Sequence, residues 1–225
     1  MRCLVRPEKL KCLERAKREN IEWSSFITLN GGKDYKQVKE KLEEMQQKLC
    51  VYCESKLNES HIEHFKCRSK FPKEKFEWDN LFVSCTTDDH CGKYKDAPKH
   101  TKYQIDNLIK PDRDNPEDYF VFLPSGRIDK KSCLSKTDMT KADETIRVLN
   151  LNHTNLVNSR QRVYKDYYEI FTSLNESDEF MIKDETRDFE FSNIVFDMMN
   201  NIEEHKSVID SVLSVITGEI NSSKN

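Results

Sequence analysis

Apolar side chains recur at helical spacing through the first fifty residues. Leu10, Leu13 and Ala16 follow one another three residues apart, after Pro7, and predict a helix within residues 7–20. A glycine pair at 31–32 interrupts the pattern. A second helix with one apolar face is then predicted over residues 36–49, and that face carries Val38, Leu42, Met45 and Leu49. Residues 1–49 are therefore expected to form an N-terminal helical region.

The pattern changes at Cys50. The stretches "HIEHF" and "NLFVSC" are short and rich in β-branched and aromatic residues, which predicts strands. Further on, "DYFVFLPSGRI" predicts a hairpin that turns at residues 124–126. Helical spacing then returns in two apolar series, the first of Ile146, Leu149, Leu156 and Val163, the second of Ile194, Val195, Met198, Met199, Ile202, Ile209, Val212, Leu213 and Ile216. The sequence predicts an α+β protein with regions 1–49, 50–100 and 101–225 in one continuous unit.

Composition narrows the class of protein. Hydrophobic residues make up 36% of the chain and charged residues 34%, which is typical of a soluble, helix-rich protein. The longest apolar runs fall short of the roughly 18 residues that a membrane helix needs. The first twenty residues are charged throughout and do not resemble a signal peptide. We expect a cytoplasmic protein without membrane contact.

The eight cysteines predict metal binding more than disulfides, because a reducing compartment keeps thiols reduced. Cys50 and Cys53 have the spacing of a zinc knuckle, and Cys85 and Cys91 follow about thirty residues later. Together they would complete a four-thiolate structural zinc site. Five residues separate the second pair, which is wider than usual, so four metal-free buried thiols are the alternative. The remaining cysteines are expected to be small core residues: Cys3, Cys12, Cys67 and Cys133.

The histidines beside these cysteines admit several interpretations. A zinc finger of Cys50, Cys53, His61 and His64 does not fit, because the gap between the two pairs and the gap between the histidines are both too short. A zinc-dependent nucleobase deaminase would use His61 and Glu63 as its H-x-E element with Cys85 downstream, but the P-C-x-x-C element is missing. That interpretation also leaves Cys50, Cys53 and His64 without a role.

A third interpretation uses all of these residues. The elements "HIEHF", "WDNLFVSC" and "HCGKYK" resemble the pattern of HNH endonucleases over about residues 48–100. With "CVYCES", "YFVFLPSGRI" and "TIRVLNLNHTNLVNSR", the chain resembles the PtuB-like family, the HNH nuclease subunits of Septu-type anti-phage defence with their retron-linked relatives. The resemblance implies a ββα-metal (His-Me finger) HNH core with a four-cysteine zinc knuckle, flanked by the N-terminal helices and the C-terminal helical region.

The resemblance also implies roles for individual residues. His64 would be the general base that deprotonates the attacking water. Glu63 matches the acid before that histidine, usually Asp, and would bind a catalytic Mg²⁺ or Mn²⁺ through a hard oxygen. Asn80 matches the middle Asn, whose side-chain or backbone carbonyl would hold the imidazole in the required tautomer.

The third position of the HNH pattern departs from the family. Gly92 stands where Asn or His is expected. His90 is the available substitute as second ligand of the catalytic cation, and the alternative is a zinc ligand in place of Cys91. Lys95 matches the lysine of the pattern and would contact phosphate. His61 is expected to pack, or to form a hydrogen bond, at the start of its strand.

Charge is unevenly distributed along the chain. Between residues 66 and 75 five bases accompany one acid, and Lys66 and Arg68 are expected beside a bound phosphate backbone, with a solvated loop as the alternative. Residues 176–204 carry ten acids against two bases. By the resemblance, the partner would be a PtuA-like ATPase subunit, which would supply any ATP dependence because the sequence contains no P-loop. The acidic C-terminal segment, with its apolar stripes, would be the docking surface for that subunit, and a core helix is the alternative.

The resemblance leaves the substrate open between DNA and RNA, including tRNA. The competing class of function is a zinc-stapled binding module for nucleic acid or protein that has no catalytic activity.

Overall fold

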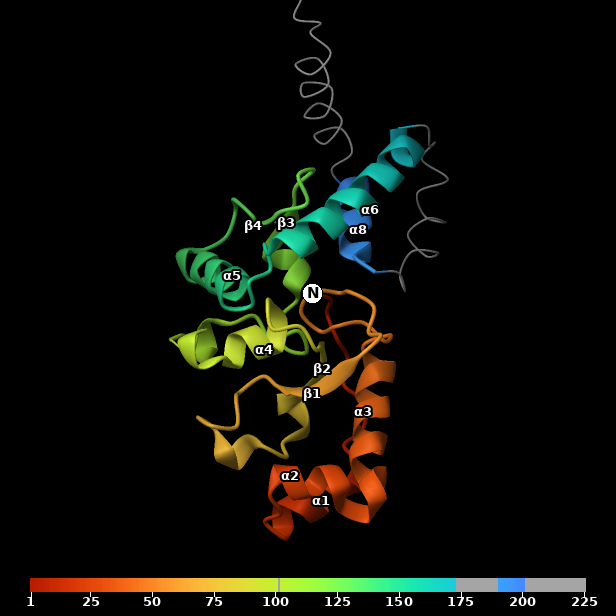
Figure 1. The fold of residues 1–225 in the computed structure, drawn as a ribbon. Helices are drawn as coiled ribbons and strands as arrows, with labels where there is room; N and C mark the ends of the chain where they lie inside the picture. Colours follow the sequence, from red (N-terminus) through yellow and green to blue (C-terminus); the bar gives the residue numbers. More distant parts are fainter. Residues whose placement is uncertain (101, 173–189, 201–225) are drawn as a thin grey trace, which may run out of the picture. The chain divides into compact units, whose positions relative to one another are not determined.

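The computed structural model describes residues 1–100, 102–172 and 190–200. It begins with three helices: α1 (Lys11–Arg18), α2 (Trp23–Thr28) and α3 (Lys33–Met45) (Figure 1). Helices α1 and α3 confirm the two helices expected from the apolar spacing. The short helix α2 was not predicted, because its six residues "WSSFIT" are too few to establish a helical period, and it forms where Trp23 and Phe26 are buried.

Two paired strands and a helix follow. Strands β1 (Ser60–His64) and β2 (Leu81–Cys85) are antiparallel, with Ile62 opposite Val83 and His64 opposite Leu81. Both strands were predicted. Helix α4 (Cys91–Asp96) packs against β2. The loop between the strands contains 3-10 turns at Pro72–Glu74 and Trp78–Asn80.

The elements after residue 100 are of the types that the sequence predicted, a hairpin followed by helices. The expected hairpin is formed by β3 (Phe120–Phe122) and β4 (Ile128–Lys130), with Gly126 at a φ of +81° in its turn. The first helical series falls into two helices, α5 (Lys136–Val148) and α6 (Thr154–Thr172), because the chain turns at Asn150, whose φ is +48°. The remaining elements are α8 (Ser192–Asn200) and 3-10 turns at Leu29–Gly32, Pro98–His100, Ile105–Asn107 and Pro116–Asp118.

The chain divides into two compact units. The first comprises residues 1–121 and 128–153, and the second comprises residues 122–127 and 154–225. The boundaries expected after residues 49 and 100 both fall inside the first unit. In the second unit α6 packs against α8. The apolar positions from Ile202 onward, predicted to be helical, lie outside the described residues.

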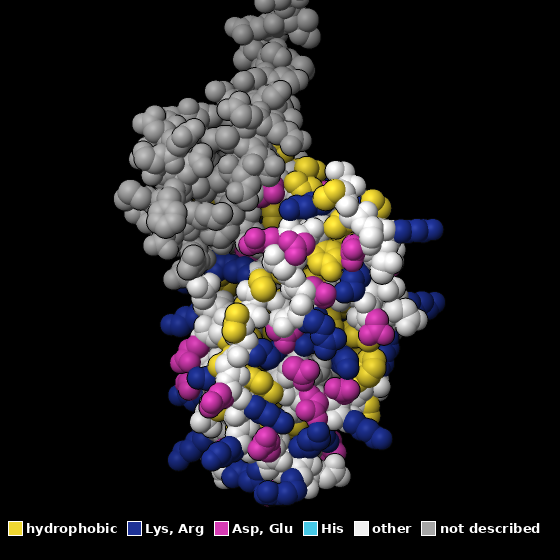
Figure 2. Space-filling view, turned by 180° about the vertical axis from the view of Figure 1, so that it is seen from behind, with side chains coloured by type: hydrophobic (Ala, Val, Ile, Leu, Met, Phe, Trp, Pro, Cys, Tyr) yellow, Lys and Arg dark blue, Asp and Glu magenta, His cyan; other side chains and the backbone are white. Residues whose placement is uncertain are grey.

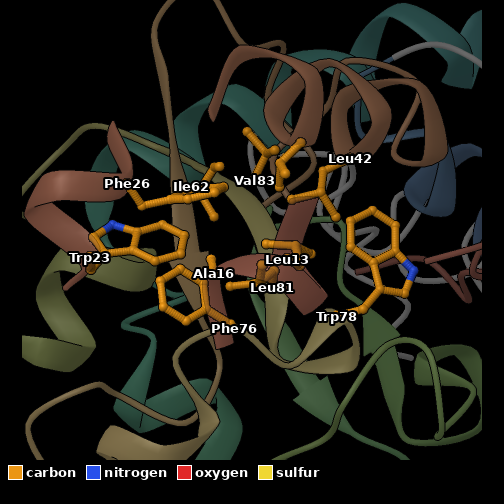
Figure 3. Packing of buried hydrophobic residues seen from close by; sticks show 11 residues of the cluster. Leu13, Ala16, Trp23, Phe26, Leu42, Ile62, Phe76, Trp78, Leu81 and Val83 are labelled. Carbon is orange, nitrogen blue, oxygen red and sulfur yellow. The ribbon is translucent and has the colours of Figure 1, made fainter. Parts of the chain in front are cut away.

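The core of the first unit decides which side chains of β1 face which way. One cluster joins α1, α2 and α3 to one face of the strand pair, and Figure 3 shows Ile62 and Val83 entering it from the strands. Because side chains alternate along a strand, His64 shares the face of Ile62, and His61 and Glu63 lie on the opposite face. Trp78 and Phe82, expected in the core, are both buried.

The cysteines outside the metal-binding pairs differ from the prediction in part. Cys3 and Cys133 are exposed, so they are not core residues, whereas Cys67 is buried and Cys12 is half-buried. On the face drawn in Figure 2, basic and acidic side chains are interspersed over the described residues. Among those residues, none of the helices combines the length and apolar character required to cross a bilayer.

Candidate functional site

The four cysteines of the two predicted pairs meet in one cluster. The sulfur atoms of Cys50, Cys53, Cys85 and Cys91 all lie within 4.8 Å of one another. They come from the turn after α3, the end of β2 and the start of α4. Four converging sulfurs form a ligand set that fits a tetrahedral divalent cation. The wide spacing of the second pair is accommodated because Cys91 adopts a φ of +64°.

The surroundings of the cluster favour negative charge on one sulfur, that of Cys50. The Cys85 backbone N–H donates to Cys50 Sγ at 3.4 Å. Burial opposes ionisation of Cys50, but hydrogen bonds from the thiols of Cys53, Cys85 and Cys91 lower its pKa well below the ordinary value. Burial raises the pKa of Cys91, and hydrogen bonding with Cys50 adds to that rise. A shared charge of this kind is what a bound cation would stabilise further.

His90 lies with the cysteines. Its Nδ1 atom is 3.1 Å from Cys91 Sγ and 3.8 Å from Cys85 Sγ, and its ring packs near that of His153. Among the described residues, no recorded contact joins His90 to Glu63. Cys91 is itself one of the four converging cysteines, so within the described residues His90 lies beside the cluster without replacing Cys91.

Glu63 is the centre of a buried polar network on the other side of β1. Its side chain is 4% exposed, and its Oε1 atom accepts from Lys95 Nζ at 3.1 Å and from the Tyr52 hydroxyl at 3.1 Å. Its Oε2 atom is 3.4 Å from His61 Nε2. Burial opposes the charge of this carboxylate, but Lys95 and then His61 outweigh that effect and lower the pKa of Glu63 to about 2. Glu63 is therefore a fixed, ionised carboxylate.

Lys95 does not occupy the position expected of a phosphate-binding lysine. Its side chain is completely buried, and its ammonium contacts Glu63 Oε1, the Asp96 carboxylate and the backbone carbonyls of His64 and Phe65. Helix α4 is short and turns this side chain inward, toward β1. Lys95 therefore stabilises Glu63 and the end of β1 and does not reach out to a substrate.

Gly92 accounts for the departure at the third position of the HNH pattern. A Cβ atom at residue 92 would lie 2.3 Å from Glu63 Oε2. Residue 92 thus faces Glu63, as the pattern requires. The Glu63 carboxylate fills the space that a side chain at residue 92 would occupy. The longer acid at 63 and the missing side chain at 92 fit each other.

The His64 ring lies on the opposite face of β1 from Glu63. It meets the Trp23 ring edge-on, with centroids 4.4 Å apart, and is 4% exposed. Its Nε2 atom is 3.0 Å from the Lys75 carbonyl oxygen. Since a carbonyl only accepts, Nε2 donates, and Nδ1 is the basic nitrogen of the neutral ring. Burial lowers the pKa of His64 to about 4, so the ring is neutral at pH 7.

Asn80 fixes the loop between the strands instead of touching the imidazole. Its Oδ1 accepts from the Lys66 backbone N–H at 2.7 Å, and its Nδ2 donates to the carbonyls of Lys66 and Glu74 at 3.1 and 3.0 Å. The carbonyl at the His64 ring belongs to Lys75, the residue after Glu74. Asn80 was expected to act on the His64 ring directly. It instead holds the loop whose Lys75 carbonyl contacts that ring.

The basic stretch from Lys66 to Lys75 places its cations over aromatic rings. The Arg68 guanidinium lies 5.7 Å from the centre of the Trp23 ring, and Lys70 Nζ lies 4.7 Å from that of Tyr103. Arg68 is exposed, whereas Lys66 is half-buried and pairs with Glu74 at 3.3 Å. Arg68 is thus the better placed of the two predicted substrate contacts, since Trp23 also touches His64.

Several residues of the site were missed by the sequence analysis. Tyr52, Asp96 and Trp23 contact Glu63, Lys95 and His64, respectively. Tyr52 lies between Cys50 and Cys53, and Asp96 is one helical turn from Gly92. These sequence positions could have identified both residues as neighbours of the site. Trp23 is distant in sequence, so only the tertiary structure brings it to His64.

The geometry also bears on the two zinc-based alternatives. A deaminase zinc would join His61 to Cys85, but Cys85 belongs to the four-cysteine cluster and His61 faces Glu63. A zinc finger would bring His61 and His64 together, yet they lie on opposite faces of β1. Neither ligand set is assembled.

The first unit thus defines a class, a mixed helix and small-sheet protein with a four-cysteine cluster suited to a metal ion. The chain is similar to the Septu protein PtuB of Bacillus thuringiensis, with 32% identity over 125 residues. The match covers 54% of this chain and 42% of that relative. No protein-family model matches the chain.

Proposed function

We propose that this chain is a metal-dependent HNH endonuclease that hydrolyses phosphodiester bonds in nucleic acid. The observation that carries the proposal is the pair Glu63–His64 at the end of β1. One member is a fixed carboxylate against α4, and the other is a neutral imidazole whose Nε2 donates to the Lys75 carbonyl. A strand pair and helix that hold an acid and a base in this way suit the ββα-metal arrangement of such nucleases.

The chain's own residues supply the proton transfer and the positioning. His64 Nδ1 takes a proton from the attacking water, and the Lys75 carbonyl keeps the ring in the tautomer that allows it. Arg68, exposed above Trp23, meets the phosphate backbone. Glu63 would hold a divalent cation such as Mg²⁺ or Mn²⁺, which would supply charge stabilisation for the leaving oxygen. Zinc at the four cysteines would brace β2 against α4.

The biological setting is proposed from the relative. Similarity to the Septu protein PtuB supports a role in anti-phage defence, with a PtuA-like ATPase as the partner subunit. The substrate would be DNA, or RNA such as tRNA. A zinc-stapled binding module is the competing function, and such a module would be unaffected by loss of His64 in a nucleic-acid assay.

The test compares wild type, His64→Ala and His100→Ala, each purified with its genomic neighbour. His100 is a half-buried histidine that stacks on Tyr94, so its removal is a matched control. Plasmid, single strands and total RNA are offered with Mg²⁺ or Mn²⁺. We expect cleavage to fall at least about 100-fold in His64→Ala alone, with zinc content unchanged. Equal activity in all three proteins, or no cleavage of any substrate, would contradict the proposal.

A further inference from the structure

His61 and Glu63 present adjacent donor atoms on the same face of β1. They are two residues apart in the strand, and His61 Nε2 lies 3.4 Å from Glu63 Oε2. Two donors that each lie about 2.1 Å from one metal ion are ~3.0–3.4 Å apart. The pair therefore already has the separation of two ligands in one coordination sphere.

The other oxygen of Glu63 is committed elsewhere. Lys95 Nζ and the Tyr52 hydroxyl both bind Oε1, at 3.1 Å each. These contacts orient the carboxylate in the way that hydrogen bonds behind a metal ligand commonly do. Oε2, on the His61 side, is the oxygen available to an ion.

Helix α4 cannot contribute a ligand at this oxygen. Gly92 lies so close that even a Cβ atom would stand 2.3 Å from Oε2. The His61 side chain is 27% exposed and that of Glu63 is 4% exposed, so an ion would reach Oε2 along the solvent-facing side of the His61 ring. A catalytic cation needs such an open side for water and substrate.

The His61 ring lacks the partners that would explain it as a structural residue. Its Nδ1 atom is buried and has no hydrogen-bond partner among the described residues. A buried polar atom without a partner is uncommon and marks a place for a water, here behind the ring and not at Nε2, the nitrogen that faces Glu63. Within the described part of the chain, the ring makes its polar contact with Glu63 alone.

We propose that His61 Nε2 and Glu63 Oε2 together bind the divalent cation, so that His61 takes the role expected of His90. Since an imidazole nitrogen binds first-row transition ions better than Mg²⁺, the site prefers an ion such as Mn²⁺. The inference rests on the proposed function only in calling this ion catalytic.

The experiment measures metal binding without any substrate. The full chain is prepared with its cysteine cluster filled with zinc, which Mn²⁺ does not displace from thiolates. Mn²⁺ and Mg²⁺ affinities are then measured by calorimetry. Pulsed electron paramagnetic resonance of bound Mn²⁺ reports whether a ¹⁴N nucleus is coordinated.

Wild type is expected to bind one Mn²⁺ with ¹⁴N coupling, and more tightly than Mg²⁺. His61→Gln should lose the coupling, bind Mn²⁺ at least about tenfold more weakly and show a smaller preference over Mg²⁺. His90→Gln should keep the coupling. Bound Mn²⁺ without ¹⁴N coupling in wild type, or coupling that survives in His61→Gln, would overturn the assignment and leave His61 as an ion-pair partner of Glu63.

The failure of this inference and that of the proposed function are distinguishable. If cleavage depends on His64 but Mn²⁺ affinity is the same with and without His61, only the assignment of His61 as a ligand is wrong. If Mn²⁺ binding depends on His61 but the chain cuts none of the nucleic acids, the metal site is supported and the proposed nuclease activity is wrong.

Discussion

His64 and Glu63 are neighbours in sequence that experience different surroundings. The side-chain alternation of β1 sends His64 toward Trp23 and Glu63 toward Lys95. The first environment is aromatic and keeps an imidazole neutral, and the second is cationic and keeps a carboxylate ionised. One dipeptide thus carries a base and an anion whose pKa values are shifted by separate causes.

The lowered pKa of His64 makes stability depend on pH. Between about pH 6.5 and pH 4 the unfolded chain binds a proton at this residue and the folded chain does not, so stability falls as the pH falls. The shift corresponds to a loss of about 3 kcal/mol over that window. Urea unfolding at pH 7 and pH 4.5 should show a steeper decrease for wild type than for His64→Gln. Parallel pH profiles would contradict the burial of a neutral ring.

The fit between Glu63 and Gly92 predicts coupled mutations. Gly92→Ala places a Cβ against the buried carboxylate and should cost about 1–3 kcal/mol of unfolding free energy. In a Glu63→Asp background the carboxylate is one methylene shorter, so the same substitution should cost about 1 kcal/mol less. Chemical denaturation of the four proteins in this cycle measures the coupling. Additive losses would mean that the two departures from the HNH pattern are unrelated.

At the scale of elements, the loop between β1 and β2 sets the position of the Lys75 carbonyl. The Asn80 side chain binds this loop at Lys66, near its start, and at Glu74, within it, and the Asn80 backbone carbonyl accepts from Phe65 N–H at 2.9 Å. The Asn80 side chain is buried, so the groups that it satisfies would be left without partners if it were removed.

Asn80→Ala should therefore lower the unfolding free energy by about 2–3 kcal/mol. The cleavage rate should fall by a larger fraction than the zinc content does. The comparison is Asn107→Ala, at a half-buried asparagine of a 3-10 turn. Calorimetric melting and metal analysis of both variants provide the measurement. Wild-type stability in Asn80→Ala would show that the loop holds its shape without this clamp.

Helix α4 connects the cysteine cluster to α5. The Cys91 backbone N–H donates to the Leu149 carbonyl at 2.8 Å, and Asn150 Nδ2 donates to the Asp89 carbonyl at 2.8 Å. These bonds hold Cys91 at its positive φ, a conformation that a non-glycine residue keeps only when its surroundings fix it. The same helix then presents Gly92 and Lys95 to Glu63.

At the scale of the whole molecule, the first unit has two sources of stability beside the strand pair. The apolar cluster of α1, α2 and α3 covers one face, and the cysteine cluster ties the end of β2 to α4. A metal ion at the cysteines adds its binding free energy to folding, because the unfolded chain has no assembled site.

Loss of this ion should lower the melting temperature. Cys50→Ser, or treatment with a strong chelator, is expected to remove one zinc per chain and to reduce the melting temperature by about 10 °C. Cys133→Ser changes an exposed cysteine and should leave both values at those of wild type. Differential scanning calorimetry with zinc quantification tests this. An unchanged melting temperature in Cys50→Ser would mean that the four thiols are simply buried.

The sequence was sufficient for α1, α3, both strands of the site and the hairpin, since each has a local period or a local turn signal. It also identified the four cysteines, from one pair at knuckle spacing and a second, wider pair about thirty residues later. It did not find α2, whose six residues are helical only because Trp23 and Phe26 are buried against other elements. It misplaced Lys95 because the direction of a side chain on a short helix depends on what the helix packs against.

The chain's local chemistry therefore determined which residue types lie next to one another: an acid before a histidine, thiols in pairs and a glycine at the third position of the motif. Tertiary structure alone decided the partners, placing His64 against Trp23, Lys95 beneath Glu63 and His90 at the cysteines. The physical reason is that spacing along a chain fixes which face a side chain takes, whereas burial and charge pairing depend on segments that meet only after folding.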